Sequence, residues 1–177
     1  MAMLRKPGFI TGLFATILAI CSGCVGVPDG LRPVEDFDLK RYLGTWYEIA
    51  RLDHSFEKGL TRVKAEYTMR EDGGIKVVNT GYDPEKKAWK EATGKGYFTA
   101  GPGIGRLKIS FFGPFYGAYN ILILDKEYSY AVVCGPSRNY LWILARKPTM
   151  DEVLKASLVD KARQMGFDTN KLIFVEQ

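Results

Sequence analysis

The chain has 177 residues, of which 46% are hydrophobic and 25% charged, and its formal net charge at pH 7 is +5. The lysines and arginines are spread without a run of five or more, so the charge pattern disfavours nucleic-acid binding and leaves only a mild attraction to anionic lipid headgroups. The length allows one folded domain after an N-terminal leader.

Residues 1–23 have the layout of a secretory signal peptide. Arg5 and Lys6 precede an uncharged, mostly apolar stretch from Gly8 to Ile20. That stretch of about 13 residues is shorter than the roughly 20 that a membrane-spanning helix needs. We therefore expect an export signal rather than a permanent transmembrane anchor.

Cys24 is the expected attachment site for lipid. Ser22 and Gly23 directly before it resemble the lipobox of bacterial lipoproteins, although Cys21 stands where that motif usually has leucine. The resemblance implies cleavage before Cys24 and acylation of its amine and thiol, with cleavage before Cys21 as the alternative. Several acyl chains would hold the protein durably on a membrane through this lipid anchor.

The mature chain divides into a tether and a folded body. Residues 24–36 are expected to be the acylated cysteine and a tether, because 25–36 contain two prolines and two glycines. Residues 37–177 form the body. With Cys24 acylated, Cys134 has no partner within the chain, so no disulfide is expected.

The body begins with eight short segments rich in aromatic and β-branched residues, separated by Gly, Pro, Asp and Asn. From Arg62 to Arg70 every odd position is apolar and every even position is polar or charged, which indicates a half-buried strand. Short turns between the segments predict antiparallel hairpins. Eight such strands can close into an up-and-down barrel that holds one small ligand. The expected strands are 43–52, 61–69, 75–82, 89–99, 105–112, 117–125, 128–134 and 140–146.

The pattern changes after Pro148. Apolar residues then recur at threes and fours, which predicts a helix capped by Thr149 and stopped by Gly166. This helix is expected to pack on the outside of the barrel. Residues 172–175 are expected to form a last short strand against the barrel wall.

Three segments resemble the lipocalin family. Gly44-Thr45-Trp46 is similar to the Gly-x-Trp signature of its first strand, and 130–136 and 140–146 fit its last two strands, with the family's basic residue at Arg146. The resemblance covers nearly the whole mature chain, and the bacterial outer-membrane lipocalins are the nearest group. It implies an all-β fold, an eight-stranded antiparallel up-and-down lipocalin barrel with one C-terminal α-helix packed outside.

The resemblance also implies a function. Such a barrel would bind a fatty acid or lysophospholipid for lipid storage or transport and for membrane maintenance. Val25 after the acylated cysteine is not the Asp that retains bacterial lipoproteins in the inner membrane. The family rules therefore place the protein in the outer membrane with its barrel facing the periplasm.

Trp46 and Arg146 are expected to meet at one end of the barrel. In an up-and-down barrel the start of the first strand and the end of the eighth lie at the same end. An indole and a guanidinium on adjacent strands can stack, which contributes about 0.5 to 2 kcal/mol. We expect this pair to close that end structurally, without contacting ligand.

The opposite end is the predicted mouth, formed by 53–60, 83–88, 112–116 and 135–139. Inward-facing residues near it are the candidate ligand-binding residues, with ordinary barrel packing as the alternative for each. Glu48, Asn79, Asn120 and the tyrosines are candidates for the few polar contacts with a headgroup. The candidate lining residues are Ala50, Val63, Ala65, Tyr67, Val77, Phe111, Tyr119, Ile121, Tyr130, Tyr140 and Trp142.

The predicted loop around residues 111–116 concentrates four aromatic residues in six positions. Three roles fit such a loop: gating an acyl chain, contacting a membrane or a second subunit in a homodimer, and packing against its own barrel.

We do not expect an enzyme, a cofactor or a metal site. His54 is the only histidine, and its place in a predicted loop indicates a solvated side chain. Gly101–Gly105 is broken by proline and has no helix after it, so it is a hairpin connection rather than a phosphate loop. A thiol-dependent lipocalin enzyme using Cys134 is one alternative, although no base adjoins it. A structural envelope lipoprotein with a filled barrel is another.

Overall fold

The computed structural model describes residues 25–177. The predicted signal peptide and the predicted acylation site Cys24 lie outside the described residues. Within residues 25–177, no helix is long and apolar enough to cross a membrane.

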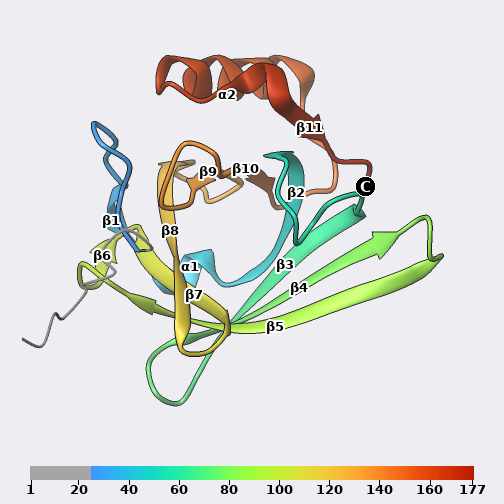
Figure 1. Ribbon diagram of the computed structural model, residues 1–177. Helices are drawn as coiled ribbons and strands as arrows, with labels where there is room; N and C mark the ends of the chain where they lie inside the picture. The colour runs from blue at the N-terminus through green and yellow to red at the C-terminus, as the bar shows by residue number, and fades with distance from the viewer. Residues whose placement is uncertain (1–24) are drawn as a thin grey trace, which may run out of the picture.

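Eight antiparallel strands form a closed barrel, as the alternation of apolar residues predicted (Figure 1). Each strand pairs with the next, and the last pairs with the first, with Trp142 opposite Arg51 and Ala145 opposite Tyr47. Closure removes both free edges of the sheet. The barrel strands are β2 Gly44–Leu52, β3 Thr61–Met69, β4 Ile75–Asp83, β5 Ala88–Phe98, β7 Arg106–Phe112, β8 Phe115–Leu124, β9 Tyr130–Cys134 and β10 Leu141–Ala145.

Four short elements were not predicted, one of which is the 3₁₀ turn η2 (Thr169–Lys171) before the last strand. The strands β1 (Glu35–Phe37) and β6 (Gly103–Ile104) pair with each other, so the connection after β5 is more than a plain hairpin turn. The helix α1 (Leu39–Tyr42) precedes β2, and the Asp38 side chain caps it by accepting a hydrogen bond from the Lys40 amide at 2.9 Å. Elements of two to four residues are too short to show a period of apolar residues.

The segment predicted as a tether lies along the barrel wall. Arg106 donates to the carbonyl of Val25 at 3.3 Å, and the Asn120 side chain donates to the carbonyl of Gly26 at 3.1 Å. Further along, Val34 forms backbone hydrogen bonds with both Ile121 and Gly105. From Val25 onward, the chain is therefore part of the folded domain.

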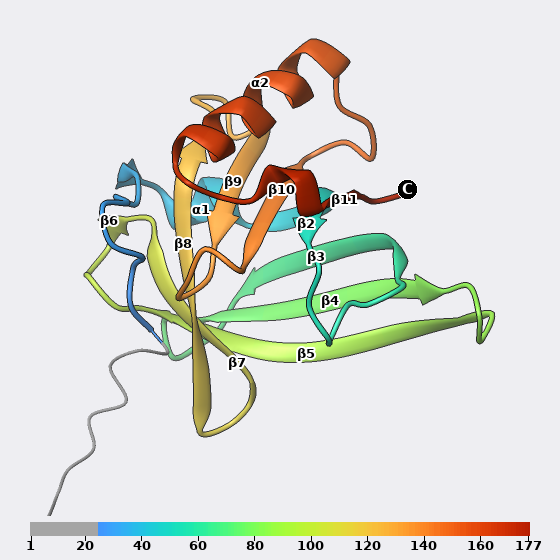
Figure 2. The same ribbon diagram turned by 45° about the horizontal axis from the view of Figure 1, so that its top comes forward.

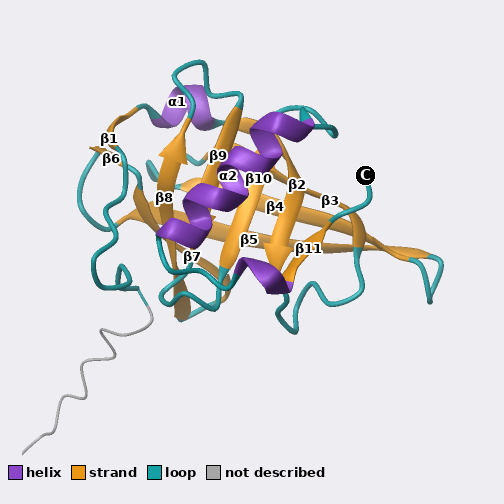
Figure 3. Ribbon diagram, turned by 90° about the horizontal axis from the view of Figure 1, so that it is seen from above, coloured by secondary structure: helices purple, strands orange, loops and turns teal. Residues whose placement is uncertain are grey.

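The predicted helix is α2 (Glu152–Gln164), which lies across the outside of the barrel over β9, β10 and β2 (Figure 3). Its cap is Asp151 rather than the predicted Thr149, because the Asp151 carboxylate accepts from the Leu154 amide at 3.0 Å. Leu158 and Ala162 are its fully buried residues, and they pack on the outer side chains of the barrel strands. The buried core beneath the helix comprises Ile49, Ala50, Leu52, Leu122, Val132, Cys134, Leu141, Ile143, Ala145, Leu158, Ala162 and Phe167.

The last residues of the chain form part of the barrel wall. The strand β11 (Leu172–Phe174) pairs with β2 from Ala50 to Leu52, whereas β3 pairs with β2 only from Gly44 to Tyr47. Beyond β11, the Gln177 side chain donates to carbonyls of both β2 and β3. The C-terminal segment 172–177 thus bridges β2 and β3 where they separate toward the mouth, and the predicted last strand is confirmed.

Leu158→Ala tests the attachment of α2. The substitution removes a fully buried side chain between helix and barrel, so we expect the free energy of unfolding to fall by about 2 to 5 kcal/mol. Urea unfolding followed by circular dichroism measures this change. The matched control is Val153→Ala on the same helix, where the side chain is 79% exposed and we expect a change within about 0.5 kcal/mol. Equal losses in the two variants would contradict the packing described.

Candidate functional site

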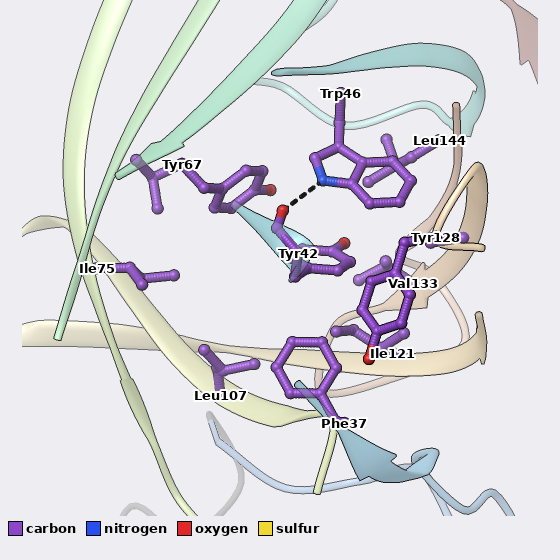
Figure 4. Packing of buried hydrophobic residues seen from close by; sticks show 12 residues of the cluster. Phe37, Tyr42, Trp46, Tyr67, Ile75, Leu107, Ile121, Tyr128, Val133 and Leu144 are labelled. Carbon is purple, nitrogen blue, oxygen red and sulfur yellow. Dashed lines mark hydrogen bonds between the residues drawn. The ribbon is translucent and has the colours of Figure 1, made fainter. Parts of the chain in front are cut away.

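One end of the barrel is closed by a stack of three side chains. The Trp46 indole lies between the Tyr42 ring, at 4.7 Å between centroids, and the Arg146 guanidinium, 4.1 Å from the indole centroid. Trp46 also donates from Nε1 to the Tyr42 carbonyl at 2.8 Å (Figure 4). Arg146 in turn donates to the backbone carbonyls of Arg41, Thr45 and Tyr128. The structure thus brings together the pair expected at this end.

Next to this stack, the hydroxyl groups of three tyrosines form hydrogen bonds inside the barrel. The Tyr119 hydroxyl lies 2.7 Å from that of Tyr42 and 2.9 Å from that of Tyr67. Burial raises the pKa of all three phenols above the usual value of 10, so they stay neutral at physiological pH. They give this part of the interior a polar group whose hydroxyls are already hydrogen-bonded to one another.

Most candidate lining residues do face the interior. Tyr67, Val77 and Ile121 are buried in its core, and Val63 lies beside the inward-facing Gly81. Other inward-facing residues remain partly exposed to solvent although they pack against this core. These partly exposed residues are Ala65, Ile109, Phe111, Tyr119 and Trp142.

Two candidates face the other way, so their predicted places in the lining are wrong. Ala50 pairs with Ile143, and both lie in the core beneath α2, because a β-bulge at Ile49 shifts the alternation of β2. Tyr130 also packs on that outer core, since the inward positions of its strand are Ala131 and Val133.

The same bulge places two charged residues inside the mouth. Glu48 and Arg51 are three residues apart, and in a regular strand side chains at that spacing lie on opposite faces. The extra residue brings both to the inner face, opposite Leu144 and Trp142 respectively. Arg51 Nη1 donates to Glu48 Oε1 at 2.7 Å, and only 4% of the Glu48 side chain and 1% of the Arg51 side chain are exposed.

Arg51 also holds the mouth loop 53–60. It donates to the carbonyls of Glu57 at 2.8 Å and Leu60 at 3.3 Å. The Glu57 carboxylate accepts from Trp142 Nε1 at 3.1 Å, which attaches the loop to β10 on the inner face of the barrel. A buried network of hydrogen bonds thus fixes the loop over part of the mouth.

His54 is buried against this network, so the expectation of a solvated side chain is wrong. Only 6% of its side chain is exposed, and Nε2 lies 3.2 Å from the Glu57 carboxylate. Its ring stacks on Phe56 at 3.9 Å between centroids and lies 5.0 Å from Trp142 and 6.1 Å from Tyr140. Tyr140, a predicted lining residue, is thereby placed among the aromatic side chains of the mouth.

Burial sets the ionisation of the mouth network. Burial and the nearby charge of Glu57 raise the pKa of Glu48 to about 8 despite the opposing effect of Arg51. Burial likewise raises the pKa of Glu57. Burial and the charge of Arg51 lower the pKa of His54 to about 4, so the imidazole is neutral at pH 7. The network therefore carries less negative charge at neutral pH than its two carboxyl groups suggest.

The rim of the mouth exposes large aromatic side chains. Phe112 and Phe115, at the β7–β8 tip, are 81% and 78% exposed, and Phe56 in the 53–60 loop and Trp89 near the start of β5 are also exposed. Of the predicted aromatic loop, Phe111 packs into the barrel interior, whereas Phe112 and Phe115 do not pack on their own barrel.

Cys134 and Asn120 lie on the outer face, away from the interior. They are paired across β8 and β9, and the Asn120 amide donates to the carbonyls of Gly26 and Gly135. Asn120 therefore holds the N-terminal segment instead of offering a contact inside the barrel. Burial raises the pKa of the Cys134 thiol to about 12, which keeps it protonated and unreactive. Within residues 25–177, no group of three acidic, histidine or cysteine side chains is placed to hold a metal ion.

Sequence reasoning missed Arg51, His54 and Glu57 as members of the mouth network. The inward orientation of Arg51 can be predicted only if the bulge at Ile49 is known, and no residue in the sequence marks that bulge. The loop 53–60 contains ordinary polar residues, and nothing in their spacing indicates that two of them are buried.

A lipocalin-like domain model matches residues 37–177, which covers the whole barrel and the helix. The chain belongs to the lipocalin family. Lipocalin barrels of eight strands hold small ligands in their interior, and the family accounts for the fold of this chain.

Related lipocalins include bacterial and plant proteins. The chain is 54% identical to outer membrane lipoprotein Blc of Vibrio cholerae over 168 residues, which cover 92% of this chain and 98% of that protein. It is 51% identical to outer membrane lipoprotein Blc of Escherichia coli K12, with 98% of each chain covered. It is also 35% identical to temperature-induced lipocalin-1 of Arabidopsis thaliana, with 80% of each chain covered.

Solved lipocalin-type barrels share the fold at lower identity. Insecticyanin of the tobacco hornworm Manduca sexta superposes with a TM-score of 0.68 at 20% identity, covering 86% of this chain and 87% of that chain. The cockroach allergen Per a 4 gives a TM-score of 0.66 at 21% identity, covering 86% of this chain and 96% of that chain.

The mouth network predicts a pH dependence of stability. Between the ordinary pKa of 4.5 and the folded value of about 8, Glu48 holds a proton that the unfolded chain releases, so stability falls as pH rises. His54 has the opposite effect between pH 4 and 6.5, because the folded imidazole stays neutral there. We therefore expect the free energy of unfolding to decline between about pH 6.5 and 8, by at most about 1.4 kcal/mol per pH unit for one proton.

Glu48→Gln should make this decline clearly smaller, as measured by urea unfolding at several pH values. The exposed Glu66→Gln on β3 is the control and should keep the wild-type decline. An unchanged decline in Glu48→Gln would show that Glu48 is not the titrating group.

Proposed function

We propose that the barrel binds one long-chain lipid, a fatty acid or lysophospholipid, and carries or stores it at the bacterial outer membrane for membrane maintenance. The acyl chain would lie in the interior and the headgroup at the mouth. The lining residues proposed for it are Val63, Ala65, Tyr67, Val77, Phe111, Tyr119, Ile121, Tyr140 and Trp142.

The observation that carries the proposal is the partial exposure of inward-facing side chains. Ala65, Phe111 and Trp142 point toward the barrel axis from β3, β7 and β10, yet solvent reaches them. Protein atoms therefore do not fill the interior completely, and most of the residues that line it are apolar or aromatic. A mostly apolar interior with a few polar groups is typical of small-ligand sites.

Asn79 supports binding of a ligand with a polar group. Its side chain faces inward, opposite Ala65, and its Oδ1 is buried without a hydrogen-bond partner among residues 25–177. A buried acceptor without a partner costs about 1 to 3 kcal/mol, so a ligand hydroxyl or amide that donates to it would be stabilising.

The location is proposed from the related proteins. Two relatives that are more than half identical are named outer membrane lipoproteins, in Vibrio cholerae and Escherichia coli. Together with the lipobox-like Ser22-Gly23-Cys24, these names favour an acylated protein on the outer membrane with its barrel in the periplasm.

Blocking the interior should abolish lipid uptake. In Ala65→Phe a large ring would occupy the space beside Asn79, so we expect the Kd for a lysophospholipid to rise at least about tenfold, as measured by tryptophan fluorescence titration. Mass spectrometry of an organic extract of the purified protein identifies any bound lipid. Thr68→Phe, on the exposed outer face of the same strand, is the control and should bind as the wild type does.

Two outcomes would contradict the carrier proposal. If the wild type takes up no lipid and none co-purifies, the protein is a structural envelope lipoprotein with a filled barrel. If Ala65→Phe binds as tightly as the wild type, the ligand does not occupy the interior.

A binding role without catalysis predicts an inert thiol. Cys134 is fully buried and is the single cysteine of residues 25–177, so we expect no maleimide labelling of the native fragment and full labelling in denaturant. Rapid labelling of the native protein would instead favour the alternative that the protein is a thiol-dependent enzyme.

A further inference from the structure

The β7–β8 hairpin ends in two exposed phenylalanines. Phe112 and Phe115 are paired opposite each other at the tip, and four-fifths of each side chain is exposed. The hairpin projects beyond the rest of the barrel, so no other described segment covers its tip (Figure 2). Phenylalanine is among the side chains that interfacial segments bury at the boundary between headgroups and acyl chains, so two exposed phenylalanines suit contact with a bilayer.

The wall of the same hairpin is basic. From Arg106 to Leu124 the chain contains Arg106 and Lys108 and no acidic residue. The Lys108 ammonium lies 4.8 Å from the Tyr116 ring centroid, and Lys95 lies opposite Ser110 on the adjacent strand. Each basic residue near an anionic membrane contributes about 1 kcal/mol of attraction. The charge of this wall therefore complements an anionic lipid surface.

The N-terminal segment reaches the barrel on this same wall. The Val25 carbonyl accepts from Arg106 at the start of β7, and the Gly26 carbonyl accepts from Asn120 on β8. A lipid on the residue before Val25 would thus be attached beside the hairpin, because consecutive Cα atoms are only about 3.8 Å apart. The β7 strand from Arg106 to Phe112 spans roughly 20 Å. The attachment point and the aromatic tip therefore lie along one hairpin.

We propose that the β7–β8 hairpin is the surface by which the barrel docks on an anionic membrane, with Phe112 and Phe115 inserted among the headgroups. This proposal rests on the proposed function for the membrane location, and it adds which face of the barrel contacts the membrane. Docking in this orientation holds the mouth at the lipid surface, so a lipid can pass between bilayer and barrel with little exposure to water.

The test is sedimentation of residues 25–177, which comprise the complete barrel and both cores, with vesicles of phosphatidylethanolamine and phosphatidylglycerol. We expect the wild-type fragment to bind without an acyl anchor. Phe112→Ser/Phe115→Ser should weaken binding at least about tenfold, because two large apolar side chains no longer leave water. Lys108→Gln should weaken binding less and reduce its dependence on salt.

Val153→Ser is the matched control, since Val153 is as exposed as Phe115 but lies on α2, and it should bind as the wild type does. The proposal is overturned if the wild-type fragment does not sediment with the vesicles, or if the double serine variant binds them as tightly as the wild type does. A third outcome would also overturn it: the wild-type fragment is a dimer, and the double serine variant is a monomer that binds vesicles as the wild type does. The tip would then be an interface with a second copy.

Lysophospholipid titration separates this proposal from the proposed function. The double serine variant should keep the wild-type Kd for a monomeric lysophospholipid, which also shows that it is folded. If the wild-type fragment binds vesicles but takes up no lipid, the result supports the docking surface and contradicts the carrier role. Loss of lysophospholipid binding in the double variant would place Phe112 and Phe115 in the ligand site and overturn the assignment of the tip to membrane docking alone.

Discussion

The stack of Tyr42, Trp46 and Arg146 joins the two ends of the sheet, and the arrangement of the barrel depends on it. Arg146 follows the last barrel strand, and its guanidinium bonds to backbone carbonyls of residues that precede or begin the first strand. A cation against an aromatic face is strengthened when water is excluded, as it is for the fully buried Trp46. Because this end is closed by protein, the accessible interior opens only toward the other end.

The mouth depends on a second local feature, the bulge in β2. One extra residue at Ile49 sends Ala50 outward to the core beneath α2 and turns Arg51 inward, where it pairs with Glu48 and holds the 53–60 loop. A single irregularity in one strand thus supplies both part of the contact with the helix and the buried charge of the mouth. Arg51 is compatible with burial because its guanidinium donates hydrogen bonds to Glu48 and to the carbonyls of Glu57 and Leu60.

The sequence predicted the barrel well because its signals are periodic. Alternation from Arg62 to Arg70 and the turn residues between segments place all eight strands, and the shared end of the first and last strands brings Trp46 to Arg146. The same alternation misplaced Ala50, because a bulge changes the inward face without any mark in the sequence. His54 was misplaced for a different reason, since its burial depends on long-range contacts with Glu57 and Trp142 that a local pattern does not encode.

The C-terminal segment 172–177 has a consequence for the order in which the molecule is built. On its β3 side, the mouth half of β2 is bridged to the neighbouring strand by the last six residues of the chain, with Val175 bonded to Ile49 and Gln177 reaching both strands. The wall is therefore incomplete until residues 172–177 have been synthesised. A nascent chain that has already formed its hairpins lacks this part of the wall beside β2, so the barrel wall is completed only when residues 172–177 join β2 and β3.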